Sequence, residues 1–270
     1  MACSGAGHRG VDEVTSLADR ARSGEVFEDD GFRLDPVIVN HLWSKNDEPW
    51  SRAIGCYHPS GLDRCPRKLW YCRIGADARG QVDPQSRLIF DTGHAVHAQL
   101  GGYMREIYSL VECSIEPQAD VEMFRVSGHA DAVLFVVATG EARRVIDFKT
   151  INDAGFGRLR EPTIDGHGSV DPATMRNYVW QLHAYMEAFG CPLSTLYFYN
   201  KNDSRRAEFS VTYSLPLWEQ IEDTIIGVEE FITTGVPPER KIDKFKCATC
   251  EYVHLCAPDG VVPATKRRKS

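Results

Sequence analysis

The sequence predicts an α/β fold with a central sheet flanked by helices, because strand and helix patterns alternate along the chain. Two apolar runs, at residues 132–138 and 143–150, have the length and turn-bounded pattern of a strand pair. Apolar residues recur at helical spacing over residues 173–189, and two more strand patterns follow at 193–199 and 207–213. Helices that alternate with strands pack against the faces of a shared sheet.

Further elements are expected before residue 132. Residues 60–71 carry apolar side chains at helical spacing and predict the start of one helix. Residues 110–126 are expected to supply one or two strands, whereas residues 1–30 are rich in Gly, Ser and charge and predict a flexible or loosely helical segment. Residues 86–108 predict a longer helix with one broad apolar face, made by Leu88, Val96, Leu100, Tyr103, Met104 and Ile107.

Two segments complete the expected layout. Residues 151–171 are rich in glycine and charge, which predicts a mobile loop. Pro216 predicts the start of a long amphipathic helix that continues to residue 232 and ends at Gly235.

Composition limits the class of protein. The chain has 270 residues with 43% hydrophobic content, which is typical of a globular domain. Its net charge of -7 means that any contact with nucleic acid must come from a local basic surface. No apolar run has the length of a membrane span and the first residues lack the apolar core of a signal peptide, which predicts a cytoplasmic protein. Nine cysteines in that setting predict metal ligands or buried thiols and not a disulfide framework.

Two acidic residues and a lysine are expected to meet at the ends of the first strand pair. Asp131 precedes one strand, and Asp147 and Lys149 lie near the end of the other. Because side chains alternate along a strand, Asp147 and Lys149 share a face and Phe148 lies opposite. Carboxylates bind Mg²⁺ or Mn²⁺, and an ammonium group stabilises an attacking hydroxide or a phosphoryl oxygen. The pattern indicates a phosphoryl-transfer site, although a surface salt bridge gives the same tripeptide.

Three more side chains are candidates for this site. His97 shares a helix face with Leu100 and Met104 and is therefore expected to point inward, where a hydrogen-bonded core histidine is the commoner explanation. Gln181 and Tyr185 are four residues apart on the strongest predicted helix and share a face. Polar residues at the border of an amphipathic helix explain that pair equally.

A cysteine pattern indicates a second site. Cys247, Cys250 and Cys256 form a C-x2-C-x5-C cluster, whose spacing favours metal over ordinary thiols. A four-thiolate site needs one more ligand, and the upstream candidates are Cys56, Cys65 and Cys72. Spacing alone does not separate Zn²⁺ from an iron–sulfur cluster.

Taken together, these motifs resemble the RecB-family nucleases of the PD-(D/E)XK superfamily. The matching motifs, in the order of the family, are Gly93-x-x-x-His97, Gly128-His-Ala-Asp131, Asp147-Phe148-Lys149 and Gln181-x-x-x-Tyr185. The cysteines resemble the iron–sulfur subset, which includes the AddB nuclease domain and the nuclease of CRISPR adaptation modules. In that subset an early Cys-Pro-Arg-Lys motif, here beginning at Cys65, supplies one ligand, and a late motif supplies three.

The resemblance implies a restriction-endonuclease-like core with a central mixed sheet, and helical N- and C-terminal parts joined by a four-cysteine cluster. The ligands of this 4Fe–4S cluster would be Cys65, Cys247, Cys250 and Cys256. The nuclease domain would span residues 56–260, after an N-terminal extension of uncertain structure at residues 1–55. Residues 261–270 are expected to form a basic, disordered tail.

The resemblance also implies a role for each residue of the first site. His97, Asp131 and Asp147 would hold Mg²⁺ or Mn²⁺, with the carbonyl of Phe148 as a further ligand. Lys149 would orient or activate the attacking water. Gln181 and Tyr185 would position the scissile phosphate or Lys149, and the metal would activate water and neutralise the developing charge.

The DNA path is expected to follow local basic and aromatic side chains. The candidates are Arg67, Lys68, Arg158, Arg160, Arg176 and Trp180. Aromatic rings stack on unpaired bases and basic groups contact phosphates. Taken singly, each is more simply explained as a solvated charge or a core aromatic.

The expected function is that of a metal-dependent DNA exonuclease that prefers single-stranded ends, in recombination, repair or phage DNA processing. One alternative is a CRISPR adaptation nuclease that trims prespacers together with an integrase. A second is a noncatalytic, redox-sensing DNA-binding module. The expected compartment is the cytoplasm, which is the host cytoplasm for a phage-encoded protein, while cleavage polarity and oligomeric state stay open.

Overall fold

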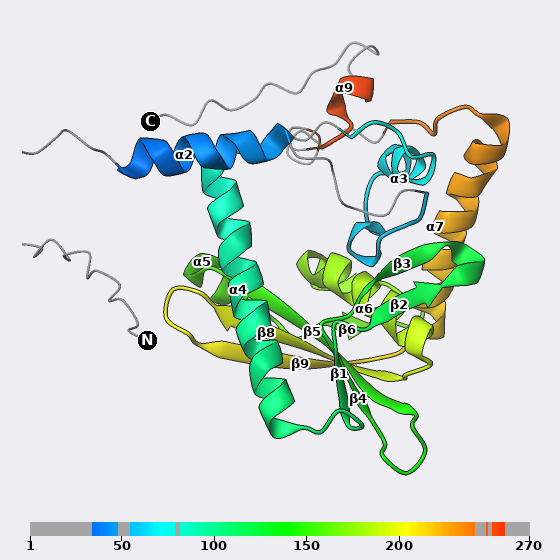
Figure 1. Ribbon diagram of the computed structural model, residues 1–270. Coiled ribbons are helices and arrows are strands. Elements are labelled where there is room, and N and C mark those ends of the chain that lie inside the picture. Colours follow the sequence, from blue (N-terminus) through cyan, green and yellow to red (C-terminus); the bar gives the residue numbers. More distant parts are fainter. Residues whose placement is uncertain (1–33, 48–54, 79–81, 241–246, 248–249, 257–270) are drawn as a thin grey trace, which may run out of the picture. The chain divides into compact units, whose positions relative to one another are not determined.

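The computed structural model describes residues 34–47, 55–78, 82–240, 247 and 250–256 (Figure 1). Most of the expected extension at residues 1–55 and the whole basic tail at 261–270 lie outside these residues. The chain divides between His41 and Leu42 into two units, so that helix α2 (Leu34–Ser44) begins in the first and ends in the second. The elements described below belong to the second unit.

The centre of this unit is a five-stranded mixed sheet. Its strands, in spatial order, are β1 (Cys113–Ile115), β4 (Ala132–Phe135), β5 (Ala142–Ile151), β8 (Leu193–Asn200) and β9 (Arg206–Thr212). Strands β5 and β8 pair in parallel, and the other neighbours pair antiparallel. A parallel pair needs a long crossover, here residues 152–192 with helix α6 (Arg176–Phe189). The predicted α/β fold with a central mixed sheet flanked by helices is confirmed.

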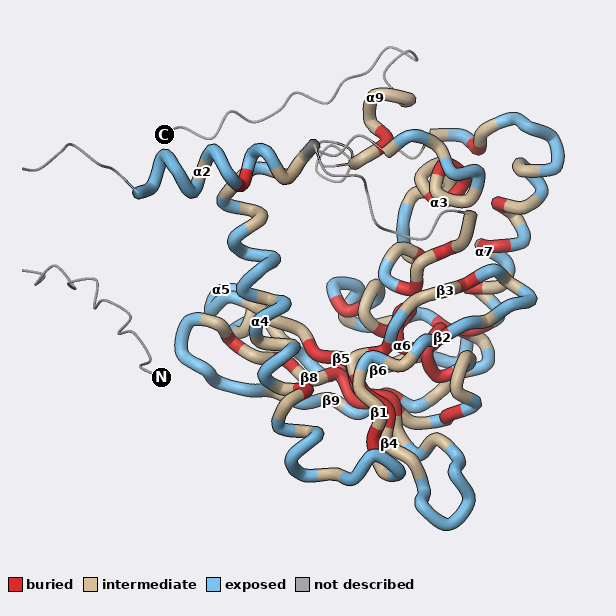
Figure 2. The backbone as a smooth tube through the Cα atoms, in the orientation of Figure 1, coloured by how far each residue is buried: buried red, intermediate tan, exposed pale blue. Residues whose placement is uncertain are grey.

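The two faces of β5 are covered by different helices. Ile146 and Phe148 belong to an apolar cluster with Leu100 and Met104 of α4 (Pro84–Ile107). Val145, on the opposite face, belongs to the larger core that contains α6. Figure 2 shows buried stretches along β5 and α6 and exposed ones along most of α4. The central strand is therefore enclosed mainly from the α6 side.

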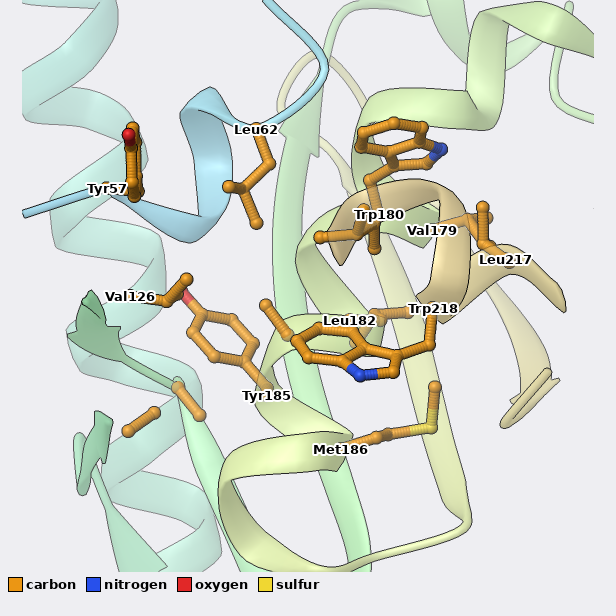
Figure 3. Close-up of a cluster of buried hydrophobic side chains, with 14 of the residues drawn as sticks. Tyr57, Leu62, Val126, Val179, Trp180, Leu182, Tyr185, Met186, Leu217 and Trp218 are labelled. Carbon is orange, nitrogen blue, oxygen red and sulfur yellow. The ribbon is translucent and has the colours of Figure 1, made fainter. Parts of the chain in front are cut away.

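Helix α6 is the most deeply buried helix of the described chain. It follows a short 3-10 turn, η4 (Ala173–Met175), and ends at Gly190, whose φ of +59° is readily adopted by glycine. Its side chains pack against the sheet, against η2 (Pro59–Gly61) and against α7 (Leu215–Thr234). Figure 3 shows Leu182 and Met186 of α6 beside Trp218 of α7. The core thus lies between the sheet and α7, with α6 at its centre.

Small elements fill the connections. A hairpin of β2 (Gln118–Val121) and β3 (Val126–His129), with η3 (Glu122–Phe124) between them, leads into β4. The expected strands within residues 110–126 are β1 and β2. The segment predicted as a mobile loop contains α5 (Asp153–Phe156) and a second hairpin, β6 (Thr163–Ile164) with β7 (Val170–Asp171). The tip of that hairpin lies against α7, where Gln220 donates a hydrogen bond to the carbonyl of His167.

Several predicted helix limits need correction. The helix expected from residue 60 begins at Pro66 as α3 (Pro66–Arg73), because the chain before it forms the 3-10 turn η2. Asp83 starts α4 by accepting the N–H of Ser86 at 3.0 Å. The long helix α7 agrees with its prediction and ends at Gly235, with φ +71°.

The broad apolar face predicted for α4 is only partly correct. Leu100 and Met104 pack on the sheet, whereas Leu88, Tyr103 and Ile107 are exposed, Ile107 to 69%. The helix covers the sheet over part of its length, so apolar spacing alone overestimated the buried face. None of the described helices is both long enough and apolar enough to cross a membrane.

Candidate active site

Asp131 is bound to the middle of the Asp147-Phe148-Lys149 motif. It lies between the end of β3 and the start of β4, and its Oδ2 accepts the backbone N–H of Phe148 at 2.6 Å. A backbone donor in the centre of β5 therefore holds Asp131 beside Asp147. The two acids, 16 residues apart in the chain, come together through the pairing of β4 with β5.

Asp147 is a buried carboxylate, with 1% of its surface exposed. Its Oδ2 forms a 2.6 Å ion pair with Nζ of Lys149 and has no further hydrogen-bond partner within the described part of the chain. Burial raises the pKa of Asp147 to about 6, and the ammonium group of Lys149 acts in the opposite direction. Because burial disfavours the ionised form, a second cation beside this carboxylate would stabilise it.

Lys149 leads into a chain of polar contacts on α6. Its Nζ donates to Oε1 of Gln181 at 3.1 Å, and Nε2 of Gln181 donates to the hydroxyl of Tyr185 at 3.0 Å. Nζ also lies 5.6 Å from the ring centroid of Tyr178. Burial raises the pKa of Tyr185, so its hydroxyl stays protonated near neutral pH. The structure thus places Lys149, Gln181 and Tyr185 in one connected group.

His97 reaches the same place from α4. Its Nδ1 lies 3.1 Å from Oδ1 of Asp131, and its ring meets that of Phe148 edge-on at a centroid distance of 6.0 Å. One turn earlier, a Cβ on Gly93 would lie 3.2 Å from Oγ1 of Thr150 on β5. The absence of a side chain at Gly93 lets α4 approach the strand closely. His97 points inward as predicted, toward a carboxylate.

Gly128, three residues before Asp131, has a packing role behind the site. A Cβ at this position would lie 2.8 Å from Cδ of Pro59 and 3.7 Å from Cε1 of Tyr185. The first distance is shorter than a carbon–carbon contact, so only glycine fits without a shift. The strand that leads to Asp131 can therefore lie directly on η2.

The donor set suits a divalent cation by its chemistry. Asp131 and Asp147 offer carboxylate oxygens, His97 offers an imidazole, and the buried Oδ2 of Asp147 has Lys149 as its one partner among the described residues. Within the described residues, however, no three His, Cys, Asp or Glu side chains lie close enough together to hold a metal ion. The fit thus rests on donor type and on the buried oxygen of Asp147, not on a completed coordination shell.

The cysteine candidates lie on two segments that pack together. Cys65 directly precedes α3, Cys250 lies three residues before helix α9 (Val253–Cys256), and Cys256 is the last residue of that helix. Lys68 of α3 forms a 2.7 Å ion pair with Glu251. The rings of Tyr71 and Tyr252 stack, with centroids 5.4 Å apart. The expected N-terminal to C-terminal contact therefore exists in the protein itself, while the four thiols do not form a metal site among the described residues.

Most of the predicted DNA contacts are engaged within the protein. Nε of Arg67 donates to the carbonyl of Pro238 at 2.7 Å, and Lys68 is in the ion pair with Glu251. Arg176 lies 3.1 Å from Asp63 and over the ring of Trp180 at 4.6 Å.

The prediction for Trp180 needs correction. Its ring is 2% exposed and belongs to the core, because α6 is enclosed on nearly all sides, and it presents no open face to a base. Arg158 and Arg160 are exposed on the segment that follows α5. Among the predicted basic contacts, these two are the most accessible to a polyanion.

A small pocket beside His97 and Asp131 contains residues that the motifs did not indicate. Gly101, Arg105 and Glu116 line it together with Phe148. Spacing could have revealed two of them, because Gly101 and Arg105 follow His97 at intervals of four residues and so share its helix face. Glu116 has no such signal, since it reaches the pocket through the pairing of β1 with β4.

No protein-family model and no curated protein sequence matches this chain. Solved structures similar to it include the alkaline exonuclease LHK-Exo of Laribacter hongkongensis, at 11% identity and a TM-score of 0.45 over 82% of this chain and 100% of that one. LHK-Exo in complex with dAMP gives 12% and 0.46 over the same shares. The protein SSO0001 gives 14% and 0.45 over 82% of this chain and 95% of that one. Similarity at this level conveys no activity to this chain.

Proposed function

We propose that this protein is a divalent-metal-dependent DNA exonuclease that hydrolyses phosphodiester bonds, preferring single-stranded ends, in recombination, repair or phage DNA processing. The observation that supports it most is the meeting of Asp131, Asp147 and Lys149, in which Oδ2 of the buried Asp147 has the ammonium group of Lys149 as its one partner among the described residues. Carboxylates beside an ammonium group match the charge pattern of phosphodiester hydrolysis, which needs a cation and a site for a developing anion.

Each residue has a distinct part in this proposal. Asp131, Asp147 and His97 would hold Mg²⁺ or Mn²⁺, with the carbonyl of Phe148 as a further ligand. When bound there, such an ion would lower the pKa of bound water and offset negative charge on the phosphoryl oxygens. Lys149 orients the attacking water, because its ammonium group is held next to Asp147. Asp147 and Lys149 lie on β5, Asp131 directly precedes β4, and His97 lies on α4, which packs on the sheet.

Gln181 and Tyr185 hold Lys149 from the other side. Oε1 of Gln181 accepts a hydrogen bond from Nζ, and Nε2 of Gln181 donates one to the hydroxyl of Tyr185. The ammonium group is thereby held between Asp147 and Gln181, with the ring centroid of Tyr178 5.6 Å away. The scissile phosphate would lie beside Lys149, where Tyr185, which stays protonated, has a hydroxyl hydrogen to offer.

A 4Fe–4S cluster on Cys65, Cys247, Cys250 and Cys256 is part of the proposal as a structural element. The packing of α3 on residues 250–256 supports it, because the two ends of the domain already meet there. A cluster between segments about 180 residues apart would remove much conformational entropy from the unfolded chain. Loss of iron and a lower melting temperature in Cys250→Ala are the expected results, and unchanged iron content and melting would contradict this role.

The decisive experiment is digestion of end-labelled single-stranded and duplex DNA with Mg²⁺ or Mn²⁺, using anaerobically purified protein. Lys149→Ala should reduce cleavage at least about 100-fold, because it removes the group that positions the nucleophile. Lys201→Ala, in the turn after β8, is the matched control and should cleave as the wild type does.

The outcomes separate the candidate functions. Metal-dependent degradation that Lys149→Ala abolishes supports the nuclease, and the position of the label then gives the polarity. DNA binding without degradation by metal-loaded wild type would contradict it and favour the noncatalytic binding module. Degradation that appears only when an integrase is added would favour the adaptation nuclease.

A further inference from the structure

The pocket beside the candidate active site opens between α4 and β1. Four of the lining residues have polar or ionisable side chains, namely His97, Arg105, Glu116 and Asp131. The others are Ala98, Gly101, Ile115 and Phe148. His97 and Asp131 belong to the proposed metal site, so the pocket is continuous with that site. The other polar side chains, Arg105 and Glu116, have no part in the mechanism above.

One face of α4 forms a wall of the pocket, through His97, Gly101 and Arg105. Gly93, His97, Gly101 and Arg105 follow each other at intervals of four residues and share one face of the helix. A Cβ on Gly101 would lie 3.1 Å from Cγ2 of Ile115, so the helix backbone rests against β1. The bare position lets Ile115 pack on the helix, and the pocket lies beside this contact, lined by the side chains of His97 and Arg105.

The guanidinium group of Arg105 has no partner among the described side chains of the protein. It is exposed and makes no hydrogen bond or ion pair with the residues that the structure describes, in contrast to Arg67, Arg73 and Arg176. Arginine binds phosphate through two parallel N–H donors. Of the side chains that line the pocket, Arg105 is the one with that capacity.

Glu116 is placed at the same rim by its backbone. Its φ of +54° lies in the left-handed region, which is uncommon for a residue other than glycine, and its N–H donates to the carbonyl of Asp131 at 3.1 Å. Its carboxylate and that of Asp131 would repel an anion that entered alone. An anion therefore enters this pocket favourably only when a cation offsets those charges.

We propose that the pocket is a phosphate subsite, in which Arg105 binds a phosphate of the DNA strand adjacent to the phosphodiester that is cleaved. This assignment rests on the proposed function and specifies where the neighbouring nucleotide lies. The repulsion from Glu116 and Asp131 makes occupancy of the subsite dependent on the divalent cation. Arg105 thus contributes to affinity for the strand only in metal-loaded protein.

Binding of a short fluorescent single-stranded oligonucleotide to the full chain tests this, with Ca²⁺ in place of Mg²⁺ so that binding is followed without cleavage. Arg105→Gln should weaken binding about tenfold, because a charge-assisted hydrogen bond to phosphate is lost. It should also reduce the slope of log affinity against log salt by about one. Arg105→Lys should fall between wild type and Arg105→Gln, since it keeps the charge but loses the paired donors.

Two controls sharpen the comparison. Arg143→Gln removes an exposed cation from the opposite end of β5 and should leave affinity unchanged. When the cation is chelated, wild type and Arg105→Gln should bind the oligonucleotide with equal affinity. Because Arg105 is exposed, we expect both arginine variants to melt as the wild type does.

Equal affinity and equal salt slope for wild type and Arg105→Gln in Ca²⁺ would overturn the subsite, as would a wild type that binds no oligonucleotide. A wild type that binds but never cleaves with Mg²⁺ or Mn²⁺ would contradict the proposed function instead. In that case the effect of Arg105→Gln on binding still decides whether the subsite exists.

Discussion

Helices α4 and α6 both contribute side chains to the candidate active site, but they are held in different ways. α6 is buried at every position from Val179 to Met186, whereas Gly101 is the one buried residue of α4. α6 is enclosed by apolar packing, and α4 is held by close backbone approach at its glycines. The positions of Gln181 and Tyr185 therefore depend on the core, and the position of His97 depends on how closely α4 approaches the sheet.

The largest expected contrast concerns the same substitution on the two helices. Leu182→Ala on α6 should lower the free energy of unfolding by about 2–5 kcal/mol, because it opens a cavity in a closely packed core. Leu88→Ala on α4, where the side chain is 50% exposed, should change it by less than about 0.5 kcal/mol. Urea denaturation measures both, and similar losses at the two positions would show that α4 is buried against something else.

A second contrast concerns histidine and pH. His183 on α6 is fully buried; its Nδ1 lies 2.8 Å from the carbonyl of Val179 and its Nε2 accepts the N–H of Ser214 at 3.0 Å. Both contacts suit the neutral ring, and burial lowers the pKa of His183 to about 4. Between pH 6.5 and 4 the unfolded chain therefore binds a proton that the folded chain does not, and stability falls as the pH falls.

The contribution of His183 is fully present above pH 6.5, and a shift of this size corresponds to about 3 kcal/mol lost by pH 4. In His183→Gln, the free energy of unfolding should depend less on pH in that window. His94→Gln, at an exposed site on α4, should follow the wild-type pH profile. The measurement is denaturant unfolding across the window, and parallel curves for wild type and His183→Gln would refute the assignment.

The smallest expected effects separate two glycines of α4. Gly102→Ala has no atom within 4 Å of the new Cβ and should raise the free energy of unfolding by about 0.5–1 kcal/mol through helix propensity. Gly93→Ala brings its Cβ to 3.2 Å from Oγ1 of Thr150, so the helix or the hydroxyl group must shift. The free-energy cost of that shift offsets the gain from helix propensity. Since His97 is one turn away, we expect Gly93→Ala but not Gly102→Ala to slow DNA cleavage. Equal stability gains with full activity in both would show that close approach at Gly93 is unnecessary.

Local patterns in the sequence determined much of this protein. The period of the apolar residues was sufficient for α6, α7 and the strand pairs β4–β5 and β8–β9, because helix and strand periods depend only on neighbouring residues. The same argument placed Asp147 and Lys149 on one face of β5, since alternation is a property of any strand. The spacing of Gln181 and Tyr185 likewise determined that they share a helix face.

Tertiary structure alone decided what those residues contact. The parallel pairing of β5 with β8, the contact of His97 with Asp131 and the burial of Asp147 all join segments that are distant in the chain. It also enclosed Trp180 and paired Arg67 and Lys68, which the local basic and aromatic residues of the sequence had suggested as DNA contacts. Local periodicity specifies the direction of a side chain from its own backbone, whereas burial, pairing and pKa depend on which other segments pack against it.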